Sequence, residues 1–239
     1  MRVPLSAVYI DGGYLTNVLR ALGKPRIDYA QFAAWCAQGF EVFRVYYYDC
    51  LPYQGPMPSP EERLRHSTTM KWMDTLNRLD RFKVRLGRLQ YRGTDDEGNP
   101  IFQQKRVDLQ LGLDIASLVA VNRAGLSMVV LTTGDSDLIP AVTAAQEAGV
   151  LVRLVHGPRD AQGRPRYHQD LWDLVDERKE TTREVLRLGQ WSGSDGHMRG
   201  GHTGRLQNEK TARIGRPLLD SGPGVPGGTP GSILDAILL

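Results

Sequence analysis

Two short apolar segments that each lead into acidic residues constrain this sequence more than any other feature. Residues 7–10 (AVYI) are followed directly by Asp11, and residues 128–131 (MVVL) lead through Thr132 and Gly134 to Asp135. Uninterrupted apolar runs of this length are typical of strands in a parallel sheet that is covered on both faces. The sequence therefore predicts an α/β fold with strands whose carboxyl ends carry acids.

The rest of the body alternates between strand-like and helix-like segments. Further strands are expected at 42–48, 82–91 and 150–155, the last of them closing the series, and helices at about 14–22, 29–38, 60–79, 108–120 and 137–147. This alternation predicts a three-layer, Rossmann-like α/β domain with a mostly parallel sheet over residues 4–180. Apolar and charged residues mix over 168–188, which predicts an amphipathic C-terminal helix.

The C-terminal part has a different composition. Residues 192–232 contain 11 Gly and 4 Pro, too little apolar surface to offset the entropy of ordering, which predicts a flexible tail. Residues 233–239 (ILDAILL) form a short apolar patch. The patch is interpreted either as a sticky end or as a motif on which a partner protein docks.

Composition mainly excludes classes of protein. Hydrophobic residues make up 41% and charged residues 24% of the chain, which excludes a wholly disordered protein. No apolar run approaches the ~18 residues of a membrane helix, so no membrane partner is expected. The two cysteines, Cys36 and Cys50, do not make a disulfide framework and indicate reduced thiols in a cytoplasmic protein. The net charge of +3 is too small to name a partner.

The acids at the strand ends form the candidate site. If the two strands are parallel neighbours, Asp11 and Asp135 meet at one edge of the sheet, where ligands of such folds bind. Asp108 follows Lys105 and Arg106 at the start of a predicted helix. Clustered carboxylates repel one another, and Mg²⁺ or Mn²⁺ would remove that conflict and activate water against a phosphodiester. The alternative for each acid alone is a helix cap, which stabilises by about 1 kcal/mol.

Three segments in order resemble the motifs of NYN domains, a branch of the PIN-like nuclease superfamily. Residues 8–12 (VYIDG) are similar to the opening motif of the family, and residues 104–108 (QKRVD), with Asp114 following, resemble its Lys-x-x-Asp segment. Residues 133–140 (TGDSDLIP) resemble its Gly-Asp-Ser-Asp-Phe-x-Pro motif. The order and spacing agree over about residues 5–157.

The resemblance implies a Rossmann-like fold and a metal-dependent ribonuclease that leaves a 5′-phosphate. Carried over by motif, the catalytic residues would be Asp11, Asp108, Asp135 and Asp137, with Mg²⁺ or Mn²⁺ on the first three. The sequence departs from the family at Tyr14, where the family usually carries Asn. Asn17, one helical turn further, is a candidate to supply the missing amide.

Basic residues near these motifs are the candidate RNA contacts. Lys105 and Arg106 directly precede Asp108, and Arg88 and Arg92 lie in the predicted strand over 82–91 and just after it. The alternation of this strand reverses at Gly87, which predicts a bulge there. The expected ligand is single-stranded RNA or a structured loop, contacted through its phosphates. A solvated, salt-bridged strand face is the alternative.

Two other functions remain to be weighed against a ribonuclease. A non-catalytic RNA-binding or scaffold protein is consistent with Tyr14 and with the tail. A phosphatase with an aspartyl nucleophile would need a second Asp two residues after Asp11, where the chain has Gly13, and no P-loop is present. The sequence leaves open whether the protein forms a homo-oligomer.

Overall fold

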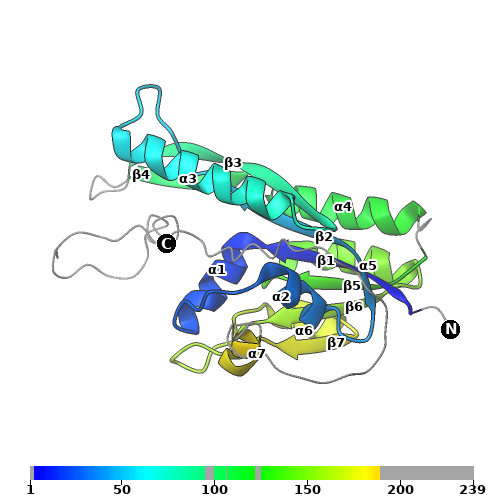
Figure 1. The fold of residues 1–239 in the computed structure, drawn as a ribbon. Coiled ribbons are helices and arrows are strands. Elements are labelled where there is room, and N and C mark those ends of the chain that lie inside the picture. The colour runs from blue at the N-terminus through cyan, green and yellow to red at the C-terminus, as the bar shows by residue number, and fades with distance from the viewer. Residues whose placement is uncertain (1–2, 95–99, 106, 122–124, 189–239) are drawn as a thin grey trace, which may run out of the picture.

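A single twisted sheet forms the centre of the protein (Figure 1). The computed structural model describes residues 3–94, 100–105, 107–121 and 125–188. Within these residues seven strands are paired in the order β4-β3-β2-β1-β5-β6-β7. The strands are β1 (Leu5–Asp11), β2 (Glu41–Cys50), β3 (Phe82–Thr94), β4 (Pro100–Lys105), β5 (Leu126–Thr132), β6 (Leu151–His156) and β7 (Glu177–Glu180). All neighbours are parallel except β3 and β4, which are antiparallel, so the predicted α/β class with a mostly parallel sheet is confirmed.

Helices cover both faces of the sheet and give the predicted three layers. The first face packs against α1 (Gly12–Ala21), α2 (Tyr29–Cys36), α3 (Pro60–Asn77) and α7 (Arg183–Leu188). The second face packs against α4 (Val107–Val121), α5 (Ile139–Glu147) and α6 (Gln169–Leu174), with a short 3₁₀ turn, η1 (Ser136–Leu138), ahead of α5. Along β1, Val8 and Ile10 belong to the apolar core on the first face, and Ala7 and Tyr9 belong to the core on the second face. This is expected because successive side chains of a strand point to opposite faces of the sheet.

The C-terminal part of the described body differs from the prediction. Residues 168–188 are not one helix, because β7 separates α6 from α7 and pairs with β6. The strand predicted over 150–155 is therefore not the last one. The residues of β7, ERKE, are charged and about half of them are exposed, as is typical of an edge strand. Their sequence would equally suit the solvent-facing side of a helix, and it is the pairing with β6 that makes them a strand.

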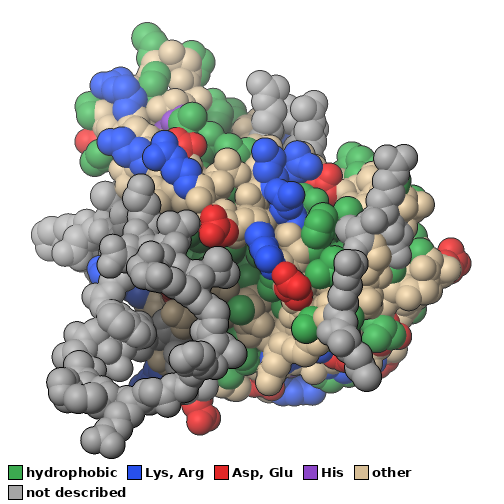
Figure 2. Space-filling view, turned by 45° about the vertical axis from the view of Figure 1, so that its right-hand side comes forward, with side chains coloured by type: hydrophobic (Ala, Val, Ile, Leu, Met, Phe, Trp, Pro, Cys, Tyr) green, Lys and Arg blue, Asp and Glu red, His purple; other side chains and the backbone are tan. Residues whose placement is uncertain are grey.

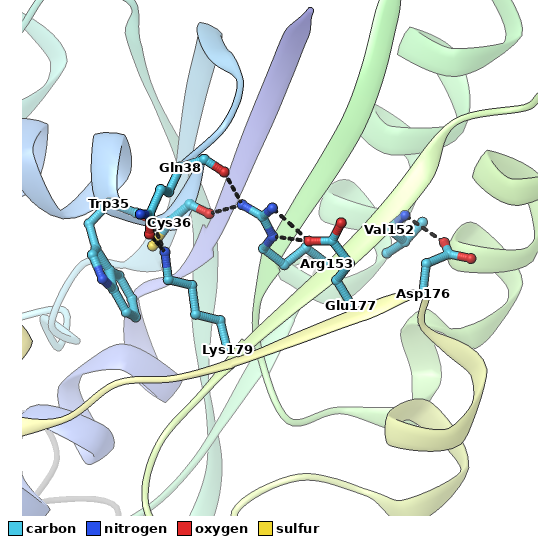
Figure 3. Close-up of polar contacts among 8 residues, drawn as sticks. All are labelled: Trp35, Cys36, Gln38, Val152, Arg153, Asp176, Glu177 and Lys179. Carbon is cyan, nitrogen blue, oxygen red and sulfur yellow. Dashed lines mark hydrogen bonds and ion pairs between the residues drawn. The ribbon is translucent and has the colours of Figure 1, made fainter.

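Cations from β6 and β7 bind the C-terminal end of α2 (Figure 3). Arg153 Nη1 donates to the carbonyl of Cys36 at 2.8 Å, and Lys179 Nζ donates to the carbonyl of Trp35 at 2.6 Å. Arg153 also pairs with Glu177, with 2.7 Å between Nε and Oε2. Carbonyls at a helix end lack helical partners, so these contacts satisfy them and fasten the edge strand to the body.

The strand β3 passes from one partner to another without the predicted bulge at Gly87. Residues 82–87 pair with β2 in regular register, and the next residues pair with β4. The irregularity in the hairpin lies further along, between Tyr91 and Gly93. The prediction of a bulge at Gly87 was therefore wrong. The alternation of apolar and polar side chains reverses at the point where β3 changes its partner from β2 to β4, and no extra residue is inserted there.

Some predicted features lie outside the described residues. These are the tail over 192–232 and the apolar patch over 233–239. In the part of the chain that the structure describes, no helix is both long and apolar enough to cross a lipid bilayer.

Candidate carboxylate site

The parallel pairing of β1 with β5 brings the two acid-bearing strand ends together. Ile10 lies opposite Thr132 in the register, so Asp11 and the segment leading to Asp135 leave the same edge of the sheet. Figure 1 shows α1, the β3–β4 hairpin and the connection between β6 and α6 at this end of the sheet. The site therefore lies at the carboxyl edge, where the topology predicts it.

Both of these aspartates are helix caps as well as site candidates. Asp11 is the N-cap of α1, and its Oδ1 accepts a hydrogen bond from the backbone N–H of Tyr14 at 3.0 Å. Asp135 is the N-cap of η1, and its Oδ1 accepts from the N–H of Asp137 at 2.9 Å. The N–H of Asp135 in turn donates to Thr133 Oγ1 at 3.2 Å. The caps fix the orientation of each carboxylate at the edge.

The charges of the aspartates act on one another. Withdrawal of Asp11 from solvent raises its pKa to about 7, and the charges of Asp108 and Asp49 add to that rise, against the hydrogen bond from Tyr14. Desolvation also raises the pKa of Asp108, followed by the charges of Asp135 and Asp137. A continuous set of interacting carboxylates therefore runs across the edge, and the four aspartates predicted from the sequence all belong to it.

Asp49 is a further member of this set that the sequence analysis missed. It is the ninth residue of β2, is 5% exposed, and accepts hydrogen bonds from Tyr47 Oη at 3.3 Å and from the N–H of Cys50 at 2.7 Å. A Cβ on Gly12 would clash with Tyr47 Oη and lie 2.7 Å from Asp49 Oδ2, so glycine is required beside Asp11. The available signal was an acid at the carboxyl end of a predicted strand.

Cys50 lies among these carboxylates and reports their convergence. Burial raises the pKa of its thiol to about 12, and the charges of Asp49, Asp108 and Asp11 all contribute to the rise. The thiol is thus protonated at neutral pH and is not a nucleophile there. Charges carried by β1, β2 and α4 therefore all act on this thiol.

Asp114 has a different position from Asp108, although both belong to α4. Its Oδ2 accepts hydrogen bonds from Tyr48 Oη at 2.8 Å and from Arg85 Nε at 3.1 Å. These contacts join α4 to β2 and β3. Asp114 therefore stabilises the packing of α4 against the sheet.

Tyr14, which stands where the family usually has Asn, is a packing residue in this structure. Its hydroxyl accepts a hydrogen bond from the N–H of Gly157 at 3.2 Å. Its ring lies beside Gly134, where a Cβ would come within 2.8 Å of Tyr14 Cε2 and would clash with the carbonyl of Arg166. Asn17 is exposed, and its Oδ1 accepts from Arg20 Nη1 at 3.0 Å along α1.

The predicted RNA-contact residues lie on the hairpin and beyond it. Arg88 and Lys105 are opposite one another in the β3–β4 register, and Arg92 is exposed on β3. Arg106 lies outside the described residues. Two other basic residues of this region form ion pairs instead, namely Arg81 with Glu41 and Arg85 with Asp114.

A second group of cations lies on α3. This helix carries Arg63, Arg65 and Lys71. Figure 2 shows Lys and Arg side chains gathered over α3 in the upper left of the view. The helix also carries Glu61, Glu62 and Asp74, so its cations and acids balance in number.

The donor set is suited to a hard divalent cation. Aspartate oxygens are the ligands that Mg²⁺ and Mn²⁺ prefer, and a cation would offset both the burial and the repulsion that raise the pKa values of Asp11 and Asp108. Among the described residues, no three His, Cys, Asp or Glu side chains are grouped closely enough to ligate one ion together. Mg²⁺ usually keeps several waters and binds one or two carboxylates directly, and the arrangement fits that mode.

Comparisons with known proteins identify the family of the chain. The chain is similar over 75% of its length to a crystal structure of a protein of unknown function from Vibrio parahaemolyticus, 96% of which is covered, at 19% identity and a TM-score of 0.45. No curated protein matches the sequence. The sequence model of the NYN domain, a nuclease-like and RNA-associated family, matches residues 6–164. This match covers most of the described body, and the chain belongs to the NYN domain family.

Proposed function

We propose that this protein is a metal-dependent ribonuclease that hydrolyses RNA phosphodiester bonds at the carboxylate edge of its sheet. The observation that carries the proposal is the set of interacting aspartates from β1, β2, α4 and η1, in which burial first and then the neighbouring charges raise the pKa values of Asp11 and Asp108. A set of acids that repel one another is costly unless a ligand uses it. The family membership supports the same reading.

Each aspartate has a proposed role. Asp11, Asp108 and Asp135 would hold Mg²⁺ or Mn²⁺, directly or through water, and the ion would supply charge neutralisation at the phosphate and acidify a bound water. Asp137 is exposed at the start of η1 and would orient the attacking water. Asp49 would keep the buried side of the set negative.

The RNA would approach over the basic hairpin. Arg88, Arg92, Lys105 and Arg106 are the proposed phosphate contacts. Phosphate contacts of this kind make binding dependent on salt and carry little sequence information. Both cysteines are buried and free, which is consistent with the proposed cytoplasmic location.

Cleavage of a labelled single-stranded RNA pool tests the proposal. The wild-type protein is incubated with Mn²⁺, Mg²⁺ or EDTA beside two variants, Asp135→Asn and the control Asp74→Asn, which changes an exposed acid of α3. The proposal expects metal-dependent cleavage by the wild type and the control, and its loss in Asp135→Asn. Cleavage that persists equally in Asp135→Asn contradicts the proposed site.

A non-catalytic RNA-binding protein is the second candidate function. It is favoured by Tyr14, whose hydroxyl is bound to the N–H of Gly157 at the place where the family usually has an amide. RNA binding by the wild type without metal-dependent cleavage would favour this candidate.

A further inference from the structure

The connection between β6 and α6, residues 157–168, is attached directly to the carboxylate site. At its start, the N–H of Gly157 donates to Tyr14 Oη at 3.2 Å, and at its end the N–H of His168 donates to the carbonyl of Gly134 at 3.0 Å. The N–H of Tyr14 binds Asp11, and Gly134 precedes Asp135 in the chain. The two anchor points therefore flank the site, and we call this segment the 157–168 loop.

Two of the three arginines in the loop are used to hold its own shape. Arg164 Nε pairs with Asp160 Oδ2 at 2.7 Å, and Arg159 Nη1 donates to the carbonyl of Gly163 at 2.8 Å. The N–H groups of Gln162 and Arg164 also donate to Asp160 Oδ1. The loop is thus built around Asp160 and does not depend on its third arginine for internal contacts.

The third arginine, Arg166, faces the anchor points. Its carbonyl packs against Gly134, and its Cδ lies 3.3 Å from the position that a Cβ on Gly157 would occupy. Its charge acts on Tyr14, where it lowers the pKa of the phenol against the larger rise from burial. The side chain therefore lies near both attachments of the loop, next to Tyr14, whose N–H is capped by Asp11.

The guanidinium of Arg166 has a donor that the described residues leave unsatisfied. Its Nε is buried and has no hydrogen-bond partner among them. Arg65 on α3 shares this property but is not attached to Asp11 or Asp135 by any contact described above. The side chain as a whole is half-exposed, and no described residue forms a hydrogen bond or ion pair with its guanidinium. A guanidinium left unpaired in this way is open to an anionic ligand.

We propose that Arg166 binds a backbone phosphate of RNA at the carboxylate edge. The inference rests on the proposed function, because it takes RNA as the ligand. The planar guanidinium presents its donors in a fork that matches phosphate oxygens, and the half-exposed side chain would offer its Nη donors to the phosphate. Arg166 is a binding residue that places the RNA beside the aspartates, and none of the NYN motifs includes it.

The test separates RNA binding from cleavage by working in EDTA. The full-length protein is titrated into a short fluorescein-labelled single-stranded RNA of mixed sequence, and Kd is measured by anisotropy over a series of salt concentrations. Arg166→Met keeps the aliphatic stem beside Gly157 and removes the guanidinium. We expect Kd to weaken by about tenfold, and the slope of log K against log salt to fall by about 0.7 for the lost phosphate contact.

Two further variants serve as controls. Arg78→Met removes the same charge from an exposed position after α3 and should leave Kd within about twofold of the wild type. Arg166→Lys keeps the charge without the fork, and should keep the salt slope while weakening Kd by less than Arg166→Met. It also preserves the test if Arg166→Met does not fold.

Thermal unfolding distinguishes binding from a purely structural role. If Arg166 binds phosphate, removal of its unsatisfied donor leaves Tm unchanged or higher while RNA binding is lost. If Arg166 only holds the loop, Arg166→Met lowers Tm, and RNA binding falls no more than the unfolded fraction explains.

The outcomes for the inference and for the proposed function differ. Equal Kd and salt slope for the wild type and Arg166→Met overturn the inference, even where metal-dependent cleavage is intact. Loss of RNA binding in Arg166→Met, together with no cleavage by the wild type, supports the inference and rejects the ribonuclease. A wild-type protein that binds no RNA overturns both.

Discussion

The hydroxyl of Tyr48 lies 2.8 Å from Oδ2 of Asp114, across 66 residues of sequence. The hydrogen bond joins the end of β2 to α4, and Arg85 on β3 adds an ion pair to the same carboxylate. Burial and the bond to Asp114 both raise the pKa of Tyr48, so the phenol donates its proton and stays neutral. These contacts hold α4, the helix that also carries Asp108, against β2 and β3.

Replacing Asp114 should cost stability. Asp114→Ala leaves the buried hydroxyl of Tyr48 without its acceptor, which we expect to reduce the free energy of unfolding by about 1–3 kcal/mol. Urea denaturation of the wild type, Asp114→Ala, Tyr48→Phe and the double variant measures the coupling. Because Tyr48→Phe removes the donor, the double variant should lose less than the sum of the single losses, and strictly additive losses would show that the bond contributes nothing.

Tyr14 should matter for folding through its hydroxyl and its ring separately. Tyr14→Phe removes the acceptor of the Gly157 N–H and is expected to cost about 1 kcal/mol, while the hydrogen bond from the backbone N–H of residue 14 to Asp11 remains. Tyr14→Asn introduces the usual residue of the family but also removes the ring beside Gly134, and should cost about 2–4 kcal/mol.

Thermal unfolding of both Tyr14 variants gives this ranking. Tyr46→Phe is a matched control on the sheet, where the ring stacks on Tyr9 at 5.0 Å between centroids. Equal stability of Tyr14→Asn and Tyr14→Phe would mean that the ring does not support Gly134.

Much of the fold and of the site followed from local patterns. Continuous apolar runs at 7–10 and 128–131 identified the central strands β1 and β5, and the acids after them identified the carboxyl edge. Asp49 directly follows the strand predicted over 42–48, as Asp11 follows the strand predicted over 7–10. The rule that selected Asp11 therefore selects Asp49 too, but none of the three family motifs includes it.

The remaining features depend on contacts between distant segments. The sequence ERKE of β7 has no apolar face, and it becomes a strand through pairing with β6 and through the bond from Arg153 to Glu177. The docking of the 157–168 loop on Tyr14 and Gly134 leaves no periodic signal either. Such features are determined by tertiary packing, which overrides local propensity.

The raised pKa of Asp11 predicts how stability changes with pH in metal-free protein. The native pKa is about 7 and the ordinary value is 3.8, so between these values the native state binds more protons than the unfolded state. Stability contributed by this group is present below about pH 4 and is lost as pH rises toward 7. Asp11→Asn should therefore flatten the decline in the free energy of unfolding over this range.

Urea denaturation in EDTA at several pH values measures this effect. Asp28→Asn, which replaces the N-cap of α2 by another good cap, is the control for removing one carboxylate. Parallel pH profiles for the wild type and Asp11→Asn would contradict the assigned pKa.

Asp49 should affect both the titration of Asp11 and the proposed cleavage. Asp49→Asn removes a negative charge that raises the pKa of Asp11, so the midpoint of the Asp11 titration should fall. The amide oxygen can still accept from the N–H of Cys50, so the fold should persist. Cleavage should drop by about 10-fold to 100-fold, as is typical when a group supporting a metal site is removed.

Carbon-detected NMR of the Asp11 carboxyl and the RNA cleavage assay measure the two consequences of Asp49→Asn. Asp170→Asn on α6, an exposed position, is the matched control. An unchanged Asp11 midpoint in Asp49→Asn would exclude Asp49 from the interacting set.

The contact between β6 and α2 gives the last prediction. Arg153 is 8% exposed and binds the carbonyls of Cys36 and Gln38 as well as Glu177, so Arg153→Met leaves several acceptors without donors. Glu177 retains solvent contact, and the expected loss is about 2–3 kcal/mol, below that of a fully buried pair. Hydrogen exchange should show the loss first in β7, because its anchor to the body is removed. Glu177→Gln keeps an acceptor for Arg153 and should lose less than half as much, whereas equal losses would place the main contribution in the ion pair and not in the carbonyls of α2.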